Sequence, residues 1–387
     1  MGRDIATLVG EIDAVRAELG ATAQQAEDER TAPGALVELM RGLRVPMVKA
    51  PESVGGDELC PPDQVRYFSA LAYANPTAGW IGFVHAGATG MIGAGLPEAG
   101  VEEVFRSGVP FCAGVAAASG TCRWVGGGWL LDGHWRFASG VRHAEFVMLG
   151  ARAAEVEPDG VPGFRRLVVP ISAVTLKDDW HVMSQKGTGS VDVLVSDVFV
   201  PDHMTLRQGT DMPRGGPLHS GLPGIVYVAG ENFGFTHGVA TRFLDELAEL
   251  AVNTSRGSEG TLADRGAFRY EFGRAVLRVE AARTLVVSAL TEAWRTCLED
   301  GAVSPRQATF VAGALAAGTA DAVEAVTHLF PFAGGSALRE SSVLQRCLRD
   351  AQGSQQHILA SSISYEKVAA AFLEKVASSQ RRPHSGV

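Results

Sequence analysis

The sequence predicts an α+β fold in which a helical N-terminal domain, a β domain and a C-terminal helical bundle follow one another. Apolar residues recur every three or four positions up to about residue 107 and again from about residue 223, which is the spacing of helices. Between these regions apolar and polar residues alternate, which is typical of strands. We therefore expect three domains, at residues 1–107, 108–222 and 223–387.

The N-terminal region shows helical spacing at residues 8–29 and 33–43. The least polar stretch of the chain runs from Ala78 to Pro97. It is rich in glycine and contains His85, and it lacks the bulky residues that face lipid, so it favours a buried helix over a membrane span.

The middle region alternates apolar and polar residues in four segments, 129–137, 144–152, 164–171 and 191–201. Turn-forming residues separate them. We expect Asp132-Gly133 to form such a turn, and Gly126-Gly127-Gly128 to lie in another. In the C-terminal region, long Ala, Leu and Val patterns predict antiparallel helices packed as a bundle.

Composition excludes several classes of function. The chain carries 34 Lys and Arg against 43 Asp and Glu, a formal charge of -9, so it has no basic field that would hold a nucleic acid. Charged residues from Arg3 onward interrupt any apolar run that a signal peptide needs, and we expect a cytoplasmic protein with no membrane partner. Five scattered cysteines form no CxxC pair, so we expect neither a disulfide framework nor a metal site.

Distinctive short segments follow one another in a set order: Pro51–Gly56, Asn75–Trp80, Gly127–Gly140, Lys186–Asp192, Gly334–Ala337 and Arg349–His357. Together they resemble the acyl-CoA dehydrogenase fold superfamily, and within it the two-component, reduced-flavin-dependent monooxygenases. The resemblance covers nearly the whole chain. It implies an N-terminal helical domain, a middle β-barrel or sandwich and a C-terminal four-helix bundle.

The resemblance also implies a cofactor and partners. The cofactor is reduced FAD or FMN (FADH2 or FMNH2), delivered by a separate NAD(P)H:flavin reductase. No GxGxxG fingerprint follows a predicted strand, which agrees with reduction outside this chain. The resemblance further implies a homo-oligomer, with a tetramer expected.

In the superfamily that this chain resembles, the residues after the Arg349-Asp350-Ala351 motif distinguish dehydrogenases from monooxygenases. Acyl-CoA dehydrogenases place a proton-abstracting glutamate shortly after this motif, and here no acid follows before His357. The monooxygenase branch places a histidine there, which implies that His357 is the base that deprotonates a small phenol, indole or amine as a C4a-hydroperoxyflavin transfers oxygen. The alternatives are a dehydrogenase or oxidase acting on a thioester, and a catalytically silent scaffold subunit that binds no flavin.

The resemblance carries over to named site residues. Ser139 is expected beside flavin N5 and His85 near the substrate as a second polar group, although His85 fits a buried core histidine equally well. Trp80 and His85 are expected to line the substrate pocket. The expected flavin contacts are Ser119, Trp135, Phe137, Ala138, Ser139, Thr188 and Ser190, together with Arg265, Gly334 and Gly335 from a neighbouring subunit.

Overall fold

A computed structural model describes residues 2–156, 162–207, 212–254 and 260–380 of the chain. The chain divides into two compact units. The first comprises residues 1–60 and 66–220, and the second comprises residues 61–65 and 221–387. Helices, strands and helices follow one another in the predicted order, while the division into three domains at residues 107 and 222 stays a prediction.

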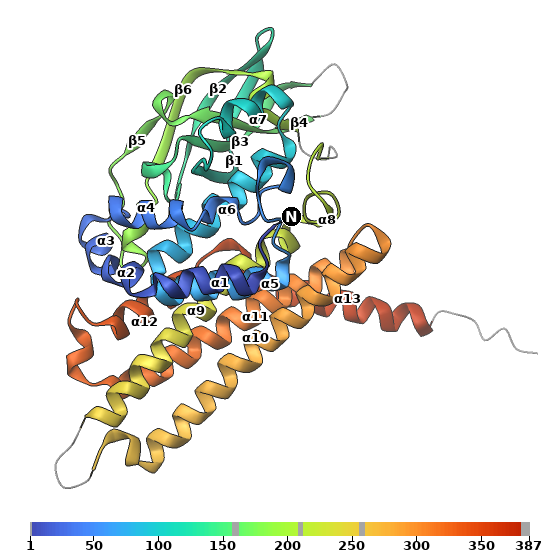
Figure 1. The fold of residues 1–387 in the computed structure, drawn as a ribbon. Coiled ribbons are helices and arrows are strands. Elements are labelled where there is room, and N and C mark those ends of the chain that lie inside the picture. Colours follow the sequence, from blue (N-terminus) through green and yellow to red (C-terminus); the bar gives the residue numbers. More distant parts are fainter. Residues whose placement is uncertain (1, 157–161, 208–211, 255–259, 381–387) are drawn as a thin grey trace, which may run out of the picture. The chain divides into compact units, whose positions relative to one another are not determined.

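The first unit begins with helices, drawn in blue in Figure 1. The central one, α6, confirms the predicted buried helix, because most of its side chains are buried and it lies against strand β1. Asn75 begins α6 by accepting a hydrogen bond from the Ala78 N–H at 3.2 Å, and Pro76 follows at the first helical position. The helices are α1 Ile5–Ala14, α2 Arg16–Ala21, α3 Ala23–Glu29, α4 Gly34–Gly42, α5 Pro61–Ala74, α6 Pro76–Gly95 and α7 Glu98–Phe105.

A single seven-stranded sheet completes the first unit, with strand order β5-β6-β2-β1-β3-β4-β7 (Figure 1). Strands β1 and β3 pair in parallel and the other neighbours pair antiparallel. Apolar side chains of the sheet form one core with those of α6 and α7. The strands are β1 Cys112–Trp124, β2 Gly128–Trp135, β3 Phe146–Val156, β4 Pro162–Pro170, β5 Thr175–Lys177, β6 Asp192–Pro201 and β7 Thr205–Arg207.

The predicted turn at Gly126-Gly127-Gly128 is confirmed as the hairpin between β1 and β2. Gly126 and Gly127 have φ of +81° and +76°, and Val125 N–H donates to the Gly128 carbonyl at 3.0 Å. Two successive positive φ angles match the twist of the flanking strands, and glycine adopts them without strain.

The predicted turn at Asp132-Gly133 is wrong, because both residues lie inside β2. The glycine serves packing instead. The fully buried indole of Trp135 lies across the backbone of Gly133 and Gly120, and a Cβ on Gly120 would overlap the ring. The register shifts between Leu131 and Gly133, which is how β2 accommodates the close approach.

The second unit is helical. Helices α9, α10 and α11 pack together, and α12 and α13 add to them (Figure 1). Helix α11 is apolar and long enough to span a membrane by length and composition, but its apolar residues are largely buried within the unit, which is typical of a core helix. The helices are α8 Pro217–Ser220 (which ends the first unit), α9 Gly224–Asn253, α10 Gly266–Asp300, α11 Pro305–Leu329, α12 Val343–Ser354 and α13 Ile363–Gln380.

The packing of Trp135 on Gly120 generates a prediction for stability. We expect Gly120→Ala to lower the free energy of unfolding by about 1–3 kcal/mol, because the methyl group forces the indole from its position. Denaturant unfolding measures the change. The matched control is Gly10→Ala in α1, where a Cβ meets nothing within 4 Å, and we expect that variant to be stabilised by about 0.5–1 kcal/mol. Equal stability of Gly120→Ala and the natural protein would contradict this account of the glycine.

Candidate functional site

Four of the predicted site residues are joined by one hydrogen-bonded chain in the first unit. The Trp80 indole N–H donates to Ser139 Oγ at 3.0 Å. Ser139 Oγ lies 2.7 Å from Ser190 Oγ, and Ser190 Oγ lies 2.7 Å from Thr188 Oγ1. Thr188 Oγ1 donates to the Gln185 carbonyl at 2.8 Å.

The groups at the two ends of this hydrogen-bonded series determine to which partner every hydroxyl within it donates. An indole N–H only donates and a carbonyl only accepts. The Thr188 hydroxyl must therefore accept from Ser190, and Ser190 must accept from Ser139. The proton of the Ser139 hydroxyl is thus committed to Ser190, and Ser139 Oγ retains a lone pair as an acceptor.

Tight backbone packing holds this chain together. The short η5 helix, Lys186–Thr188, lies against the start of α6, where a Cβ on Gly187 would overlap Thr77. The Gly140 N–H donates to the Thr188 carbonyl at 2.9 Å and the Ala138 N–H donates to the Val191 carbonyl at 3.1 Å. The segment around Ser139 is therefore held from both sides by backbone hydrogen bonds.

His85 lies fully buried on α6, next to the Ser139 segment. Its Nδ1 lies 3.1 Å from the Cys112 carbonyl, which makes Nδ1 the protonated nitrogen. Its Nε2 is buried and has no hydrogen-bond partner among the described residues. A Cβ on Gly140, which has a φ of +71°, would lie 2.5 Å from that nitrogen. Burial lowers the pKa of His85 to about 4, so the ring is neutral near pH 7.

The remaining flavin contacts predicted in the first unit differ in exposure. Trp135 and Ala138 are fully buried, and the Trp135 indole donates to the Gly150 carbonyl at 2.7 Å. Phe137 is 67% exposed with a φ of +63°, and its ring meets that of Trp180 edge-on at 6.1 Å. Ser119 is exposed, at a register shift in β1. Phe137 is thus the accessible aromatic side chain of this segment.

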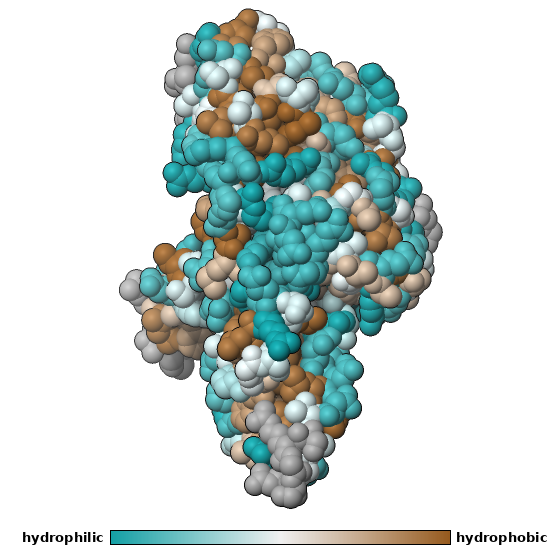
Figure 2. Space-filling model, turned by 90° about the vertical axis from the view of Figure 1, so that its left-hand side faces the viewer, coloured by the Kyte–Doolittle hydropathy of each residue, from teal (hydrophilic) through white to brown (hydrophobic). Residues whose placement is uncertain are grey.

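The sheet of the first unit also carries exposed apolar side chains. Trp124, Leu194 and Phe199 belong to β1 and β6 and are each more than a third exposed. Figure 2 shows hydrophobic surface gathered at the top of its view, where the sheet lies. Exposed apolar clusters of this kind mark surfaces that bind a ligand or another chain.

In the second unit, His357 follows α12 at the start of the short η11 helix, Ile358–Ala360. Two hydrogen bonds from α9 and α12 hold this turn. Thr236 Oγ1 donates to Ser354 Oγ at 2.9 Å, and the Ser354 hydroxyl in turn donates to the Ala351 carbonyl at 2.7 Å. The His357 N–H donates to the Ser354 carbonyl at 3.2 Å, which fixes the histidine backbone to the end of α12.

The His357 ring is partly buried and neutral. Burial lowers its pKa to about 4. Its Nδ1 lies 3.3 Å from Asn232 Nδ2 on α9 and 3.4 Å from the Leu359 N–H. The sequence analysis did not single out Asn232. The signal for it was a set of polar residues, Glu231, Asn232, Thr236 and His237, within a helix segment rich in apolar residues and glycine.

The other predicted residues of the second unit lie at the ends of helices. Arg265 immediately precedes α10. Gly334, with a φ of +73°, joins the short helices η9, Phe330–Ala333, and η10, Gly335–Leu338. A Cβ on Gly335 would meet nothing within 4 Å, so this turn presents open backbone.

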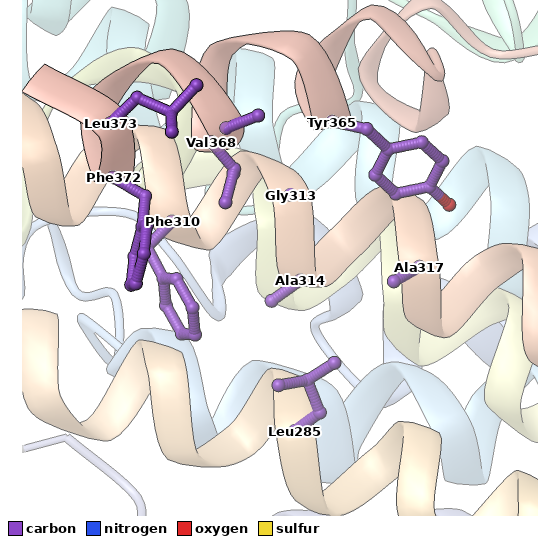
Figure 3. A pocket seen from close by; sticks show the side chains of 10 residues that line it. Leu285, Phe310, Gly313, Ala314, Ala317, Tyr365, Val368, Phe372 and Leu373 are labelled. Atoms are coloured by element: carbon purple, nitrogen blue, oxygen red, sulfur yellow. The ribbon is translucent and has the colours of Figure 1, made fainter.

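A cavity of about 600 Å³ lies between α10, α11 and α13. Figure 3 shows apolar side chains pointing into it from these helices, with the Tyr365 hydroxyl at its margin. It contains none of the predicted site residues. Its lining has no carboxylate, histidine or cationic side chain, and the Tyr365 hydroxyl is its one polar side-chain group. Across the described ranges, no group of three or more His, Cys, Asp or Glu side chains is arranged to hold a metal ion.

Comparison with known proteins covers both units. Residues 234–362 match the family model "Acyl-CoA dehydrogenase, C-terminal domain". The chain is similar to XiaF from Streptomyces, solved with FADH2 and glycerol, with a TM-score of 0.87, 24% identity and 96% of both chains covered. This chain has the acyl-CoA dehydrogenase fold. The predicted fold class is thereby confirmed for this acyl-CoA dehydrogenase-fold protein.

The relatives of this acyl-CoA dehydrogenase-fold protein are oxygenases. It is 26% identical over 383 residues to "Flavin-dependent monooxygenase, oxygenase subunit HsaA" of Mycobacterium tuberculosis, with 92% of each chain covered. It is 25% identical over 379 residues to the oxygenase component of an FADH2-dependent resorcinol hydroxylase of Rhizobium, covering 91% of this chain and 90% of the relative. It also resembles TdsC from Paenibacillus, solved with FMN and indole, with a TM-score of 0.77, 18% identity, and 95% and 98% coverage.

The neutral state of His85 generates a prediction for pH dependence. The folded protein holds this ring neutral to about pH 4, whereas the unfolded chain protonates it near the ordinary histidine pKa of 6.5. The stability that this group contributes is therefore complete above about pH 6.5 and is lost as pH falls toward 4, by on the order of 3 kcal/mol.

His85→Asn tests this, because the shorter amide retains a donor for the Cys112 carbonyl and does not titrate. Unfolding free energies of both proteins are measured from pH 7 to pH 4.5. We expect the natural protein to lose more stability over this range than the variant. Parallel pH curves for the two proteins would contradict the assignment.

Proposed function

We propose that this chain is the oxygenase component of a two-component flavin monooxygenase. It uses O2 and reduced FAD or FMN, supplied by a separate NAD(P)H:flavin reductase, to hydroxylate a small aromatic substrate of the phenol or indole type, or an amine. Two relatives named as flavin-dependent oxygenase components support this along more than 90% of the chain. The observation that carries the proposal is the neutral His357 after the Arg349-Asp350 motif, where a dehydrogenase needs a carboxylate.

The hydroxyl chain of the first unit fits a reduced flavin. When bound, the flavin supplies the activation of O2 that no amino acid side chain provides. A reduced flavin carries a proton on N5, and Ser139 Oγ retains an acceptor for such a donor. Exposed Phe137 offers an apolar face for the ring, whereas Trp135 is committed to the core of the sheet. XiaF binds FADH2 and TdsC binds FMN, and the proposal holds for either cofactor.

His357 is proposed as the base toward the substrate. A ring whose pKa is about 4 is almost wholly neutral at pH 7 and keeps a lone pair for the proton of a substrate hydroxyl or amine, although the same burial makes it a weaker base. Between residues 343 and 360 the only acidic side chain is Asp350, which is buried on α12. Dehydrogenation of a thioester, which needs a carboxylate base here, is therefore the less supported alternative.

We further propose that the chain works as a cytoplasmic homo-oligomer, a tetramer. The apolar cavity between α10, α11 and α13 supports this, because its rim includes the exposed rings of Phe310 and Phe372 and the exposed Leu373. Apolar surface of this kind is typical of contacts between subunits. Arg265, Gly334 and Gly335 are proposed to contact the flavin of a neighbouring subunit in that assembly.

The acceptor role of Ser139 predicts a preference for reduced flavin. We expect Ser139→Ala to weaken binding of anaerobically reduced FAD about 5- to 10-fold, because one hydrogen bond to N5–H is lost, and to affect oxidised FAD less. Equilibrium titrations under argon and in air measure the two affinities. The matched control is Ser196→Ala, an exposed serine on β6, which we expect to change neither. Equal losses for reduced and oxidised FAD in Ser139→Ala would contradict the proposed acceptor role.

The base role of His357 predicts loss of oxygenation with retained flavin binding. Enzyme with reduced FAD or FMN is mixed with 18O2 and a panel of indole, resorcinol and p-hydroxyphenylacetate, and products are analysed by mass spectrometry. We expect 18O in a product, and about 10²-fold or greater slowing in His357→Ala. The control His203→Gln, a surface histidine beside Glu103, retains the natural rate. Reduction of bound FAD by an acyl-CoA, with no labelled product, would favour the dehydrogenase alternative.

A further inference from the structure

We propose that Asn232 is a positioning residue that selects the working tautomer of His357, by accepting the Nδ1 proton on its amide oxygen. This inference rests on the proposed function and deepens it. It explains why Nε2 of the His357 ring, and not Nδ1, accepts the proton of the substrate.

The contacts of Asn232 single it out. It lies in the first third of α9, is only 1% exposed, and brings its amide nitrogen within 3.3 Å of His357 Nδ1. Its amide oxygen is also buried, and no group in the described part of the chain forms a hydrogen bond with it. A buried amide oxygen without a donor is costly, so a device that gives it one is favoured.

Rotation of the amide provides that donor. The oxygen and nitrogen of a side-chain amide exchange places on a half turn, with almost no change in volume. After rotation, Asn232 Oδ1 faces Nδ1 of the ring at hydrogen-bonding distance. Nδ1 then carries the proton and donates it to the amide oxygen. The competing contact, from the Leu359 N–H to Nδ1, is long at 3.4 Å, so little is lost when it breaks.

The base role requires this tautomer. A neutral imidazole has one N–H and one lone pair, so Nε2 can accept a proton only if Nδ1 carries the hydrogen. In the proposed step the substrate hydroxyl or amine loses its proton to Nε2, and the resulting imidazolium keeps its Nδ1–H on Asn232 Oδ1. With the amide nitrogen facing the ring instead, Nδ1 holds the lone pair and Nε2 is already protonated.

Thr236, on the same helix as Asn232, provides a control that distinguishes an effect on the His357 ring from an effect on the turn before it. Thr236 lies one turn after Asn232 and binds Ser354, which holds the backbone of the turn before His357. The Thr236 hydroxyl donates to Ser354 Oγ and not to the imidazole. Thr236→Val is therefore the matched control, because it alters the support of the loop and leaves the tautomer to Asn232.

Solid-state NMR of protein labelled with 15N-histidine measures the tautomer directly, without flavin or substrate. The chain has ten histidines, and the spectrum of His357→Gln identifies the signal that belongs to His357. At pH 7 we expect the natural protein and Thr236→Val to show Nδ1–H at His357. We expect Asn232→Ala to show Nε2–H, because the Leu359 N–H then donates to Nδ1. Asn232→Asp, which only accepts, keeps Nδ1–H.

Nε2–H in the natural protein, or Nδ1–H retained in Asn232→Ala, would overturn the inference whatever the activity. If Asn232→Asp fails to fold, the natural protein and Asn232→Ala still decide. Turnover supplies a second readout: we expect Asn232→Ala to oxygenate about 10-fold or more slowly, because the resting ring presents the wrong nitrogen. If NMR shows the predicted tautomers but neither the natural protein nor any variant oxygenates a substrate, the proposed function is refuted. The assignment of Asn232 then still stands.

Discussion

The indole N–H of Trp80 can only donate, and the carbonyl of Gln185 can only accept. Between these two fixed ends, the hydroxyls of Ser139, Ser190 and Thr188 have a single arrangement of protons. The candidate site of the first unit depends on this constraint, because it turns a serine that is nominally both donor and acceptor into an acceptor. The packing of η5 on α6 and the backbone hydrogen bond from Gly140 to Thr188 keep these hydroxyls within hydrogen-bonding distance of one another.

Burial has a second effect in each unit, which is to keep a histidine uncharged. Desolvation lowers the pKa of His85 in the first unit and of His357 in the second unit to about 4. Around each of these histidines, neutral dipoles in place of free charges keep out the ordered water that charges would bring.

Much of this was accessible from the sequence, and the exceptions have physical causes. The low polarity of residues 78–97 predicted the buried helix α6, and periodicity predicted the order of helices and strands, because burial imposes both patterns over many residues. The glycines at 126 and 127 predicted a hairpin, because their conformation is local. The Asp132-Gly133 prediction failed because Gly133 packs against Gly120 on the neighbouring strand, and a contact between residues on different strands leaves no local pattern. Asn232 was missed for a related reason: its partner is 125 residues away in the chain.

The glycine at position 140 meets two demands at once, a left-handed backbone and direct contact with the unpartnered nitrogen of His85. The peptide that carries Ser139 is consequently wedged against α6 and has no freedom to slide. Redesign of this scaffold would therefore meet a rigid turn around Ser139, next to the proposed flavin site. A change at either member of the Gly140 and His85 pair calls for a compensating change at the other.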